Sequence, residues 1–168
     1  MKNKITLIII FLILILGLGI GYLISLQETK MKSPNIESEK SENIVFNKFG
    51  GGTIDLKDYI GKKPVVLDFW ASWCPNCQRS MPVLNQLYSK YKDDVEVIGV
   101  NIKEPESLIK EFVDSYKINF PIVFDLDGEI SREYGINYTN VHVLVGIDGK
   151  VIRVIPGDIA EADIKSLL

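Results

Sequence analysis

Metal ligands and cross-linking residues are scarce in this sequence of 168 residues, which holds only two cysteines and one histidine. A closed structural zinc site takes four ligands, so Cys74, Cys77 and His142 would need carboxylates to complete one. Because both cysteines lie in one Cys-x-x-Cys motif, none is left elsewhere for lipid attachment. The net charge of −3 argues against a nucleic acid as the partner.

The sequence also lacks a glycine-rich phosphate-binding motif, and it has a long segment without proline. The run Gly50-Gly51-Gly52 lacks the G-x-x-x-x-G-K-[ST] spacing of a phosphate-binding loop and a helix directly after it, so it predicts only a turn. No proline lies between Pro121 and Pro156. This second gap becomes informative once the fold of that segment is predicted.

The N-terminus holds a long apolar run. Residues 5–24 are interrupted only by a threonine, three glycines and a tyrosine, and they are long enough to span a bilayer. No A-x-A-like cleavage site follows, so we expect residues 5–26 to be an uncleaved transmembrane signal anchor, with cleavage as the alternative. Lys2 and Lys4 favour a short cytoplasmic segment at residues 1–4. We therefore expect a single-pass protein of the cell membrane with its domain outside the cytoplasm.

A polar tether separates this anchor from the domain. Residues 27–43 contain serines and mixed charges without an apolar period, which predicts a linker. Periodicity returns at Ile44, and we expect one domain over residues 44–168. Its first part, up to Leu56, predicts a short antiparallel pair around the glycine run.

The two cysteines lie where a predicted strand meets a predicted helix. Residues 65–69 form an almost uninterrupted apolar run, typical of a strand buried on both faces. Apolar residues then recur every three or four positions over residues 77–91, which predicts a helix on a core. Pro75 suits the first helical position, which places Cys74 at the helix N-terminus, where free N–H groups and the helix dipole favour a thiolate. Cys77, one turn later, is predicted to face the core.

Three interpretations of this motif compete. A structural cross-link gains little, because closing so short a loop removes only about 2 kcal/mol of chain entropy. A structural zinc site would need two more ligands besides Cys74 and Cys77, and the sequence has only one histidine and no further cysteine to supply them. The third interpretation is a redox pair, in which an exposed thiolate at Cys74 attacks a disulfide and Cys77 resolves the mixed intermediate. We favour the redox pair.

The segments after the cysteine helix alternate between strands and helices, which predicts an α/β domain with a parallel core. We expect, in order, a strand, a helix, a strand, a short helix, a hairpin and a last helix, at residues 95–100, 105–116, 121–124, 129–134, 141–155 and 159–168. Asp148-Gly149 is a strong signal for the hairpin turn. A two-residue loop there would pair Ile147 with Lys150, His142 with Ile155, and Leu144 with Arg153.

The cysteine motif resembles that of a known family. Asp-Phe-Trp-Ala-Ser-Trp-Cys-Pro-Asn-Cys at residues 68–77, followed by Met81-Pro82, is similar to the active-site segment of thioredoxin-like proteins, in particular the membrane-anchored TlpA/ResA group. The resemblance extends from about Ile44 to the C-terminus. It implies a thioredoxin-like fold, with a central mixed sheet, helices on both faces, and the inserted strand and helix that mark the TlpA/ResA group.

The resemblance also implies a thiol–disulfide oxidoreductase and assigns roles to single residues. Cys74 would be the nucleophile, Cys77 the resolving thiol and Asp68 the acceptor of the Cys77 proton. A carboxylate inside an apolar strand should have a raised pKa, although a capped or partly exposed strand Asp is the alternative. The substrate groove would be lined by Trp73, Pro75, Asn76, Asn140 and Val141.

Partners follow from the same resemblance. Protein disulfides or thiols outside the cytoplasm would be the substrates, and a membrane thiol relay of the CcdA/DsbD kind would supply electrons. Reduction of apocytochrome c in cytochrome c maturation is the family precedent. The Cys74–Cys77 disulfide would be the redox group, so we expect no separate cofactor.

Two positions depart from the family pattern. Ser80 stands where many TlpA/ResA-like proteins carry a glutamate before Met-Pro. Asn140 stands where thioredoxin-like folds place a cis-proline that faces the cysteines, and Val141-His142 follows where Thr-Thr is usual. A non-proline cis peptide costs about 3 to 4 kcal/mol, so we expect a trans peptide before Asn140 and a reshaped groove.

His142 has three open interpretations after these departures. It could be a structural residue of its strand, a residue of the substrate groove, or a ligand that joins Cys74 and Cys77 in binding Cu(I) or zinc. The last interpretation would make the protein a metal-binding or metal-delivery module instead of an oxidoreductase.

Overall fold

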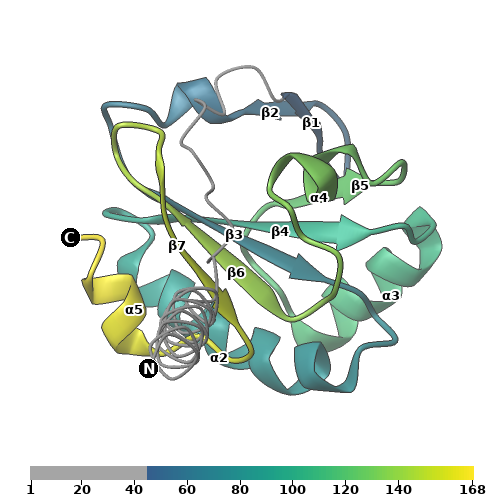
Figure 1. Ribbon diagram of the computed structural model, residues 1–168. Coiled ribbons are helices and arrows are strands. Elements are labelled where there is room, and N and C mark those ends of the chain that lie inside the picture. Colours follow the sequence, from purple (N-terminus) through teal and green to yellow (C-terminus); the bar gives the residue numbers. More distant parts are fainter. Residues whose placement is uncertain (1–44) are drawn as a thin grey trace, which may run out of the picture. The chain divides into compact units, whose positions relative to one another are not determined.

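The computed structural model describes residues 45–168 (Figure 1). The predicted cytoplasmic segment, signal anchor and linker, at residues 1–4, 5–26 and 27–43, lie outside the described residues. Each helix within residues 45–168 is too short or too polar to cross a membrane.

A five-stranded mixed sheet forms the centre of the domain, in the order β5-β4-β3-β6-β7. The central strand β3 runs parallel to β4 and antiparallel to β6, so one half of the sheet is parallel and the other half is a hairpin. All six residues of β3 are buried, as its apolar run predicts. The strands are β3 (Val65–Trp70), β4 (Glu96–Ile102), β5 (Ile122–Asp125), β6 (Val141–Val145) and β7 (Val151–Pro156).

Both faces of the sheet are covered (Figure 1). On one face, α2 (Pro75–Tyr91), α3 (Glu106–Tyr116) and α5 (Glu161–Lys165) bury an apolar cluster that contains both cysteines. On the other face, the antiparallel pair of β1 (Val45–Asn47) and β2 (Thr53–Asp55) packs with α4 (Glu129–Glu133). A 3-10 turn, η1, follows β2 at Leu56–Asp58. The predicted order of elements is confirmed, including the inserted strand β5 and helix α4.

The last helix is shorter than expected. Residues 159–168 were predicted to be helical, and α5 covers only Glu161–Lys165. The Asp163 carboxylate accepts a hydrogen bond from the Ala160 N–H at 2.8 Å, which fixes the start of the helix one turn before that aspartate. Ile164 is buried against the cysteine-containing cluster, so this single turn still closes the domain.

The hairpin between β6 and β7 corrects one detail of the predicted register. His142 pairs with Ile155 and Leu144 with Arg153, as predicted. The turn differs, because the Gly146 N–H donates to the Lys150 carbonyl at 2.8 Å and the Gly149 N–H donates to the Gly146 carbonyl at 2.9 Å. The predicted pairing of Ile147 with Lys150 is therefore wrong.

A difference in turn geometry explains this correction. The predicted two-residue turn needs positive φ at both central residues, whereas only Gly149 has one here, at 79°. The loop therefore takes three residues and ends on this left-handed glycine. A register shift between Leu144 and Val145 absorbs the extra residue, which is why the pairing farther along the strands is as predicted.

Candidate active site

The two cysteines lie at the junction of β3 and α2, as predicted. Cys74 is the residue that caps the helix, its Sγ accepts a hydrogen bond from the Cys77 N–H at 3.1 Å, and Pro75 opens the first turn. A disulfide joins Cys74 and Cys77 across a Cα–Cα distance of 5.3 Å. After reduction, the Cys74 sulfur is left at the positive end of a 17-residue helix, a position that stabilises a thiolate.

Little of either sulfur-bearing residue is exposed in this disulfide form. Cys77 is 1% exposed, as expected for the core-facing position. Cys74 is only 5% exposed, although the sequence predicted an exposed thiol. Trp73 is 65% exposed, and Pro75 and Asn76 are exposed beside it, so these three residues make the surface around the disulfide.

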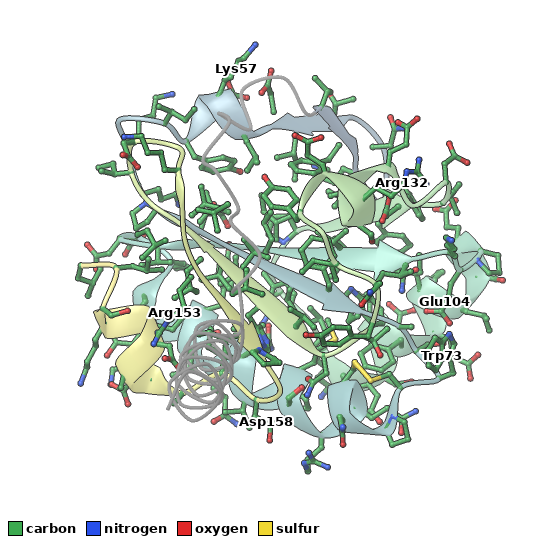
Figure 2. All side chains as sticks on the ribbon, in the orientation of Figure 1. Lys57, Trp73, Glu104, Arg132, Arg153 and Asp158 are labelled. Atoms are coloured by element: carbon green, nitrogen blue, oxygen red, sulfur yellow. A yellow bond between two sulfur atoms is a disulfide. The ribbon has the colours of Figure 1, made fainter. Side chains whose placement is uncertain are left out.

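A buried glutamate that the sequence did not predict holds the loop before the cysteines. Glu104 Oε2 accepts from the Ser72 N–H at 2.6 Å and from Asn101 Nδ2 at 2.8 Å, and Oε1 accepts from Ser72 Oγ at 2.5 Å. Gln78 of α2 donates to the Ser72 carbonyl at 2.7 Å. These bonds fix the segment that carries Trp73. Trp73 and Glu104 lie on the side of the molecule that carries the disulfide (Figure 2).

Beneath the cysteine helix, Asp68 of β3 lies directly opposite His142 of β6. The Asp68 side chain shares the sheet face of Val66 and Trp70, which belong to the same buried cluster as Cys77. His142 Nε2 lies 3.2 Å from Asp68 Oδ1, a close contact that does not have the angle of a hydrogen bond. Burial raises the pKa of Asp68, and the charge of His142 acts in the opposite direction with the smaller effect. The predicted direction of this pKa change is confirmed.

Hydrogen-bonding capacity is left unused in this pair. Asp68 Oδ2, His142 Nδ1 and His142 Nε2 are buried and have no hydrogen-bond partner. Burying such groups without partners destabilises a fold, so the pair is not explained by stability.

Asn140 occupies the place of the expected proline and uses bonds that a proline cannot make. It has φ of 60°, and no cis peptide occurs within residues 45–168, which confirms the predicted trans bond. Its N–H donates to the Phe69 carbonyl at 2.8 Å, and its carbonyl accepts from the Gly157 N–H at 2.8 Å. Its side chain accepts from Ser80 Oγ at 2.9 Å and donates to Asp158 at 3.3 Å.

These contacts place two predicted groove residues in the interior. Asn140 is 5% exposed and Val141 is fully buried, so neither side chain offers open surface. His142, at 1% exposure, is equally enclosed, which argues against its interpretation as a groove residue. Ser80 stands where the sequence resemblance led us to expect a glutamate in many proteins of the group, and its hydroxyl donates a hydrogen bond to the Asn140 side chain.

The metal interpretation finds no support in the described part of the chain. Residues 45–168 contain no group of three or more His, Cys, Asp or Glu side chains arranged to hold a metal ion. Cys74 and Cys77 are bonded to each other, and His142 contacts Asp68.

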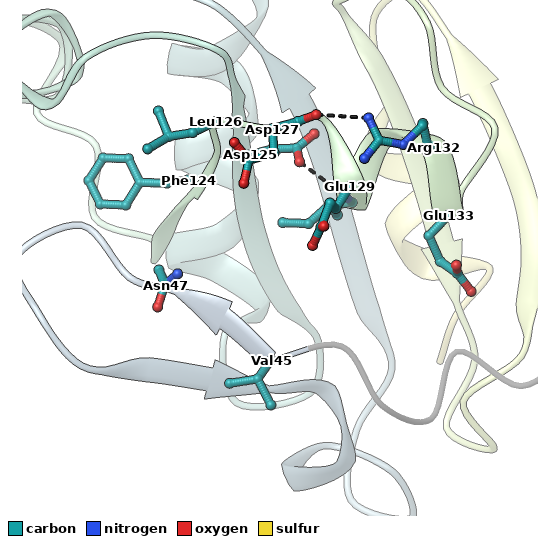
Figure 3. Close-up of a pocket in the computed structure, with 10 residues that line it drawn as sticks. Val45, Asn47, Phe124, Asp125, Leu126, Asp127, Glu129, Arg132 and Glu133 are labelled. Atoms are coloured by element: carbon teal, nitrogen blue, oxygen red, sulfur yellow. Dashed lines mark hydrogen bonds between the residues drawn. The ribbon is translucent and has the colours of Figure 1, made fainter.

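A pocket of 730 Å³ lies away from the cysteines (Figure 3). It is lined by residues of β1, β5 and α4 and is open to solvent, and the Arg132 guanidinium on its wall donates to the Asp127 carbonyl at 2.8 Å. The Asp125 carboxylate on this wall accepts from the N–H groups of Ile130 and Ser131 and so caps α4. None of the side chains predicted for the active site lines this pocket.

The AhpC/TSA family profile matches residues 32–154, well over half of the sequence. The chain belongs to the AhpC/TSA family. Among its relatives, the thiol-disulfide oxidoreductase ResA of Bacillus thuringiensis is 38% identical over 141 residues, which cover 83% of this chain and 80% of the relative. ResA of Bacillus subtilis is 32% identical over 143 residues, 84% of this chain and 79% of the relative.

Solved structures of thiol–disulfide exchange proteins have a similar fold. StoA from Bacillus subtilis matches with a TM-score of 0.65 and 26% identity, over 74% of this chain and 94% of StoA. A putative thiol:disulfide interchange protein DsbE from Chlorobium tepidum matches with a TM-score of 0.68 and 28% identity, over 77% and 93%. This AhpC/TSA protein therefore has the thioredoxin-like fold and is a thiol–disulfide oxidoreductase of the ResA type.

Proposed function

We propose that this protein is a membrane-tethered reductase of disulfides in exported proteins, with Cys74 as the nucleophile and Cys77 as the resolving thiol. The observation that supports this most is the position of Cys74, the capping residue of α2, with an exposed tryptophan beside it. A sulfur there is activated by the helix terminus, while Cys77 is shielded by the core.

The reaction needs two exchange steps and one internal proton acceptor. The Cys74 thiolate attacks a substrate sulfur, and the other substrate sulfur leaves as a thiol after protonation. Cys77 then loses its proton and attacks Cys74 Sγ, which releases the second substrate thiol and forms the Cys74–Cys77 disulfide. We propose that Asp68 takes the Cys77 proton, because a raised pKa makes this buried carboxylate a better proton acceptor near neutral pH.

Substrates would dock at the exposed edge made by Trp73, Pro75 and Asn76. A large exposed aromatic residue beside a reactive sulfur suits an extended peptide that carries a disulfide. The backbone N–H and carbonyl of Asn140 are already bonded to Phe69 and Gly157, so they are occupied within the domain.

The location and the electron donor rest on the sequence. The apolar run at residues 5–24, preceded by Lys2 and Lys4, supports an anchor with the domain outside the cytoplasm. There, a membrane thiol relay of the CcdA/DsbD kind would return electrons to the Cys74–Cys77 disulfide, and apocytochrome c is a substrate to test. The absence of a separate cofactor stays a prediction.

Reduction of insulin disulfides by the full-length protein in mild detergent tests the cysteine roles. Cys74→Ser should reduce turnover to background, whereas Cys77→Ser should accumulate a mixed disulfide with the substrate that mass spectrometry detects. In the reduced protein, iodoacetamide should label Cys74 before Cys77. Faster labelling at Cys77 would reverse the assigned roles.

Protease treatment of intact spheroplasts tests the location. Digestion of the domain from outside is expected, with a cytoplasmic protein as the protected control. Complete protection of the domain would overturn the orientation and remove exported proteins as substrates.

A further inference from the structure

Asp68 and His142 form a buried ionisable pair that stability does not explain. Both side chains are almost completely enclosed, at 3% and 1% exposure, and they approach to 3.2 Å on the sheet face that α2 covers. Three of their polar atoms have no hydrogen-bond partner. His142 also stands at a position where the resemblance led us to expect threonine, so this pair is a property of this chain.

A single proton makes such a pair electrically neutral. A buried carboxylate alone is penalised by desolvation, and so is a buried imidazolium alone. With one proton between them, the pair is neutral overall, whether the proton lies on oxygen or on nitrogen, and without it the pair carries one negative charge. Two ionisable groups this close titrate as one unit.

We propose that Asp68 and His142 hold one proton jointly, and that His142 is a positioning residue that sets the pH range in which this pair takes the proton of Cys77. The proposal rests on the proposed role of Asp68 as the proton acceptor and adds a second member to it. His142 acts through Asp68 and does not touch the reacting sulfurs.

The step balances without any further reactant. Cys77 as a thiol gives its proton to the negatively charged pair, and its electron pair forms the new bond to Cys74 Sγ. The bond between Cys74 and the substrate sulfur breaks, and its electrons leave with the substrate thiolate, which takes a proton from water. When the disulfide is reduced again, the pair returns its proton to Cys77.

Few other ionisable groups face this pair from the neighbouring elements. Cys77 of α2 is bonded to Cys74 in this form. Arg153 of β7 pairs with Asp163 of α5 at 2.5 Å, at the partly exposed edge of this face. Burial is the larger influence on the pKa of Asp68 and raises it, and the charge of His142 is the smaller and opposing influence.

Because His142 is the only histidine of the chain, its ring gives a single set of imidazole signals in NMR spectra. We would titrate the full-length protein in detergent micelles from pH 5 to 9, in the oxidised and in the reduced state. The midpoint of the His142 signals should differ between the two states, because only reduced Cys77 exchanges a proton with the pair. Asp68→Asn should abolish that difference. A His142 signal with the same titration in both redox states would overturn the proposal.

Release of thionitrobenzoate from Ellman's reagent provides the kinetic test. The first equivalent reports attack by Cys74 and the second reports resolution by Cys77, so the Cys77→Ser variant should release only one. In the negatively charged pair His142 is neutral, and its imidazole is one of the two sites that can hold the shared proton. In His142→Asn, Asp68 alone must take the Cys77 proton, so the pH midpoint of the second release should move down, while the first release keeps its wild-type profile.

Leu144→Ala is the matched control, because Leu144 lies two residues along the same strand on the same face. It should lower stability without moving the pH profile. If Asp68→Asn changes the second release but His142→Asn does not, the role of His142 is overturned and the proposed acceptor stands. If neither variant changes it, the proposed role of Asp68 fails as well.

Discussion

Two buried carboxylates lie near the cysteine pair, and they are bonded in opposite ways. Both oxygens of Glu104 are occupied by three donors from Ser72 and Asn101. Asp68, equally buried, has one oxygen with no hydrogen-bond partner and a second oxygen in a misaligned contact with His142.

The difference in hydrogen bonding gives the two carboxylates different roles: Glu104 holds the active-site loop, and Asp68 keeps an oxygen without a partner. A carboxylate whose oxygens all accept hydrogen bonds gains those bonds only while the surrounding backbone stays in place, so Glu104 makes the active-site loop rigid. Asp68 is buried without such donors, so no hydrogen bonds compensate for the lost solvation of its negative charge. Burial therefore raises the pKa of Asp68, and one oxygen is free to take a proton.

Removal of the Glu104 carboxylate should give the largest loss of stability. Glu104→Ala leaves the Ser72 N–H, the Ser72 hydroxyl and the Asn101 amide without their partner, and we expect a loss of about 3 kcal/mol in the free energy of unfolding. Glu104→Gln keeps an accepting oxygen and should lose less. Urea unfolding of the oxidised protein measures both. Glu111→Ala, an exposed glutamate of α3, is the control and should change stability little. A loss below about 1 kcal/mol in Glu104→Ala would mean that the hydrogen bonds of Glu104 do not stabilise the domain, and Glu104 would then not differ from Asp68 in this respect.

Asn140, at the place of the expected proline, resembles Glu104 in that its polar groups have hydrogen-bond partners. Substitution of Asn140 tests whether these bonds also stabilise the domain. Asn140→Ala loses the bonds to Ser80 and Asp158 and puts an alanine at φ of 60°, which we expect to cost about 2 kcal/mol. Asn140→Gly loses the same bonds without the backbone strain and should cost about 1 kcal/mol. Thermal unfolding of the two variants separates strain from bonding, and equal losses would show that the left-handed backbone is not strained in alanine.

The fold and the position of the cysteines could be predicted from the sequence because the signals are local. The apolar run of β3, Pro75 and the helical period after Cys77 all lie within residues 65–91. His142 pairs with Ile155 as predicted although the predicted turn was wrong, because the register shift between Leu144 and Val145 offsets the extra residue of the loop.

The groups that hold the site could not be predicted in the same way. Ser72 and Glu104 are 32 residues apart, and their contact depends on how the ends of β3 and β4 meet. The contact between Asp68 and His142 depends on the register of β3 against β6, which no turn connects. Asn101 and Glu104 do follow a predicted parallel strand at its carboxyl end, where sites in α/β proteins gather, and that was the available signal.

The smallest expected effect is a change of stability with pH. It concerns Asp68, the carboxylate that lacks hydrogen-bond donors. In the unfolded chain Asp68 ionises near its ordinary pKa of 3.8, whereas burial raises its pKa in the folded protein. Between these two values the folded state keeps a proton that the unfolded state has lost, so the stability of the wild-type protein falls as the pH rises through that interval. Asp68→Asn cannot ionise and should lack this decline.

The stability of Asp68→Asn relative to wild type should therefore increase from pH 4 to pH 8. Urea unfolding at the two pH values measures it, with the oxidised protein so that neither cysteine titrates. Leu144→Ala, which changes no charge, should show the same loss at both pH values. A relative stability of Asp68→Asn that decreases with pH would mean that Asp68 is ionised and stabilising in the folded protein, like a carboxylate with all its donors in place.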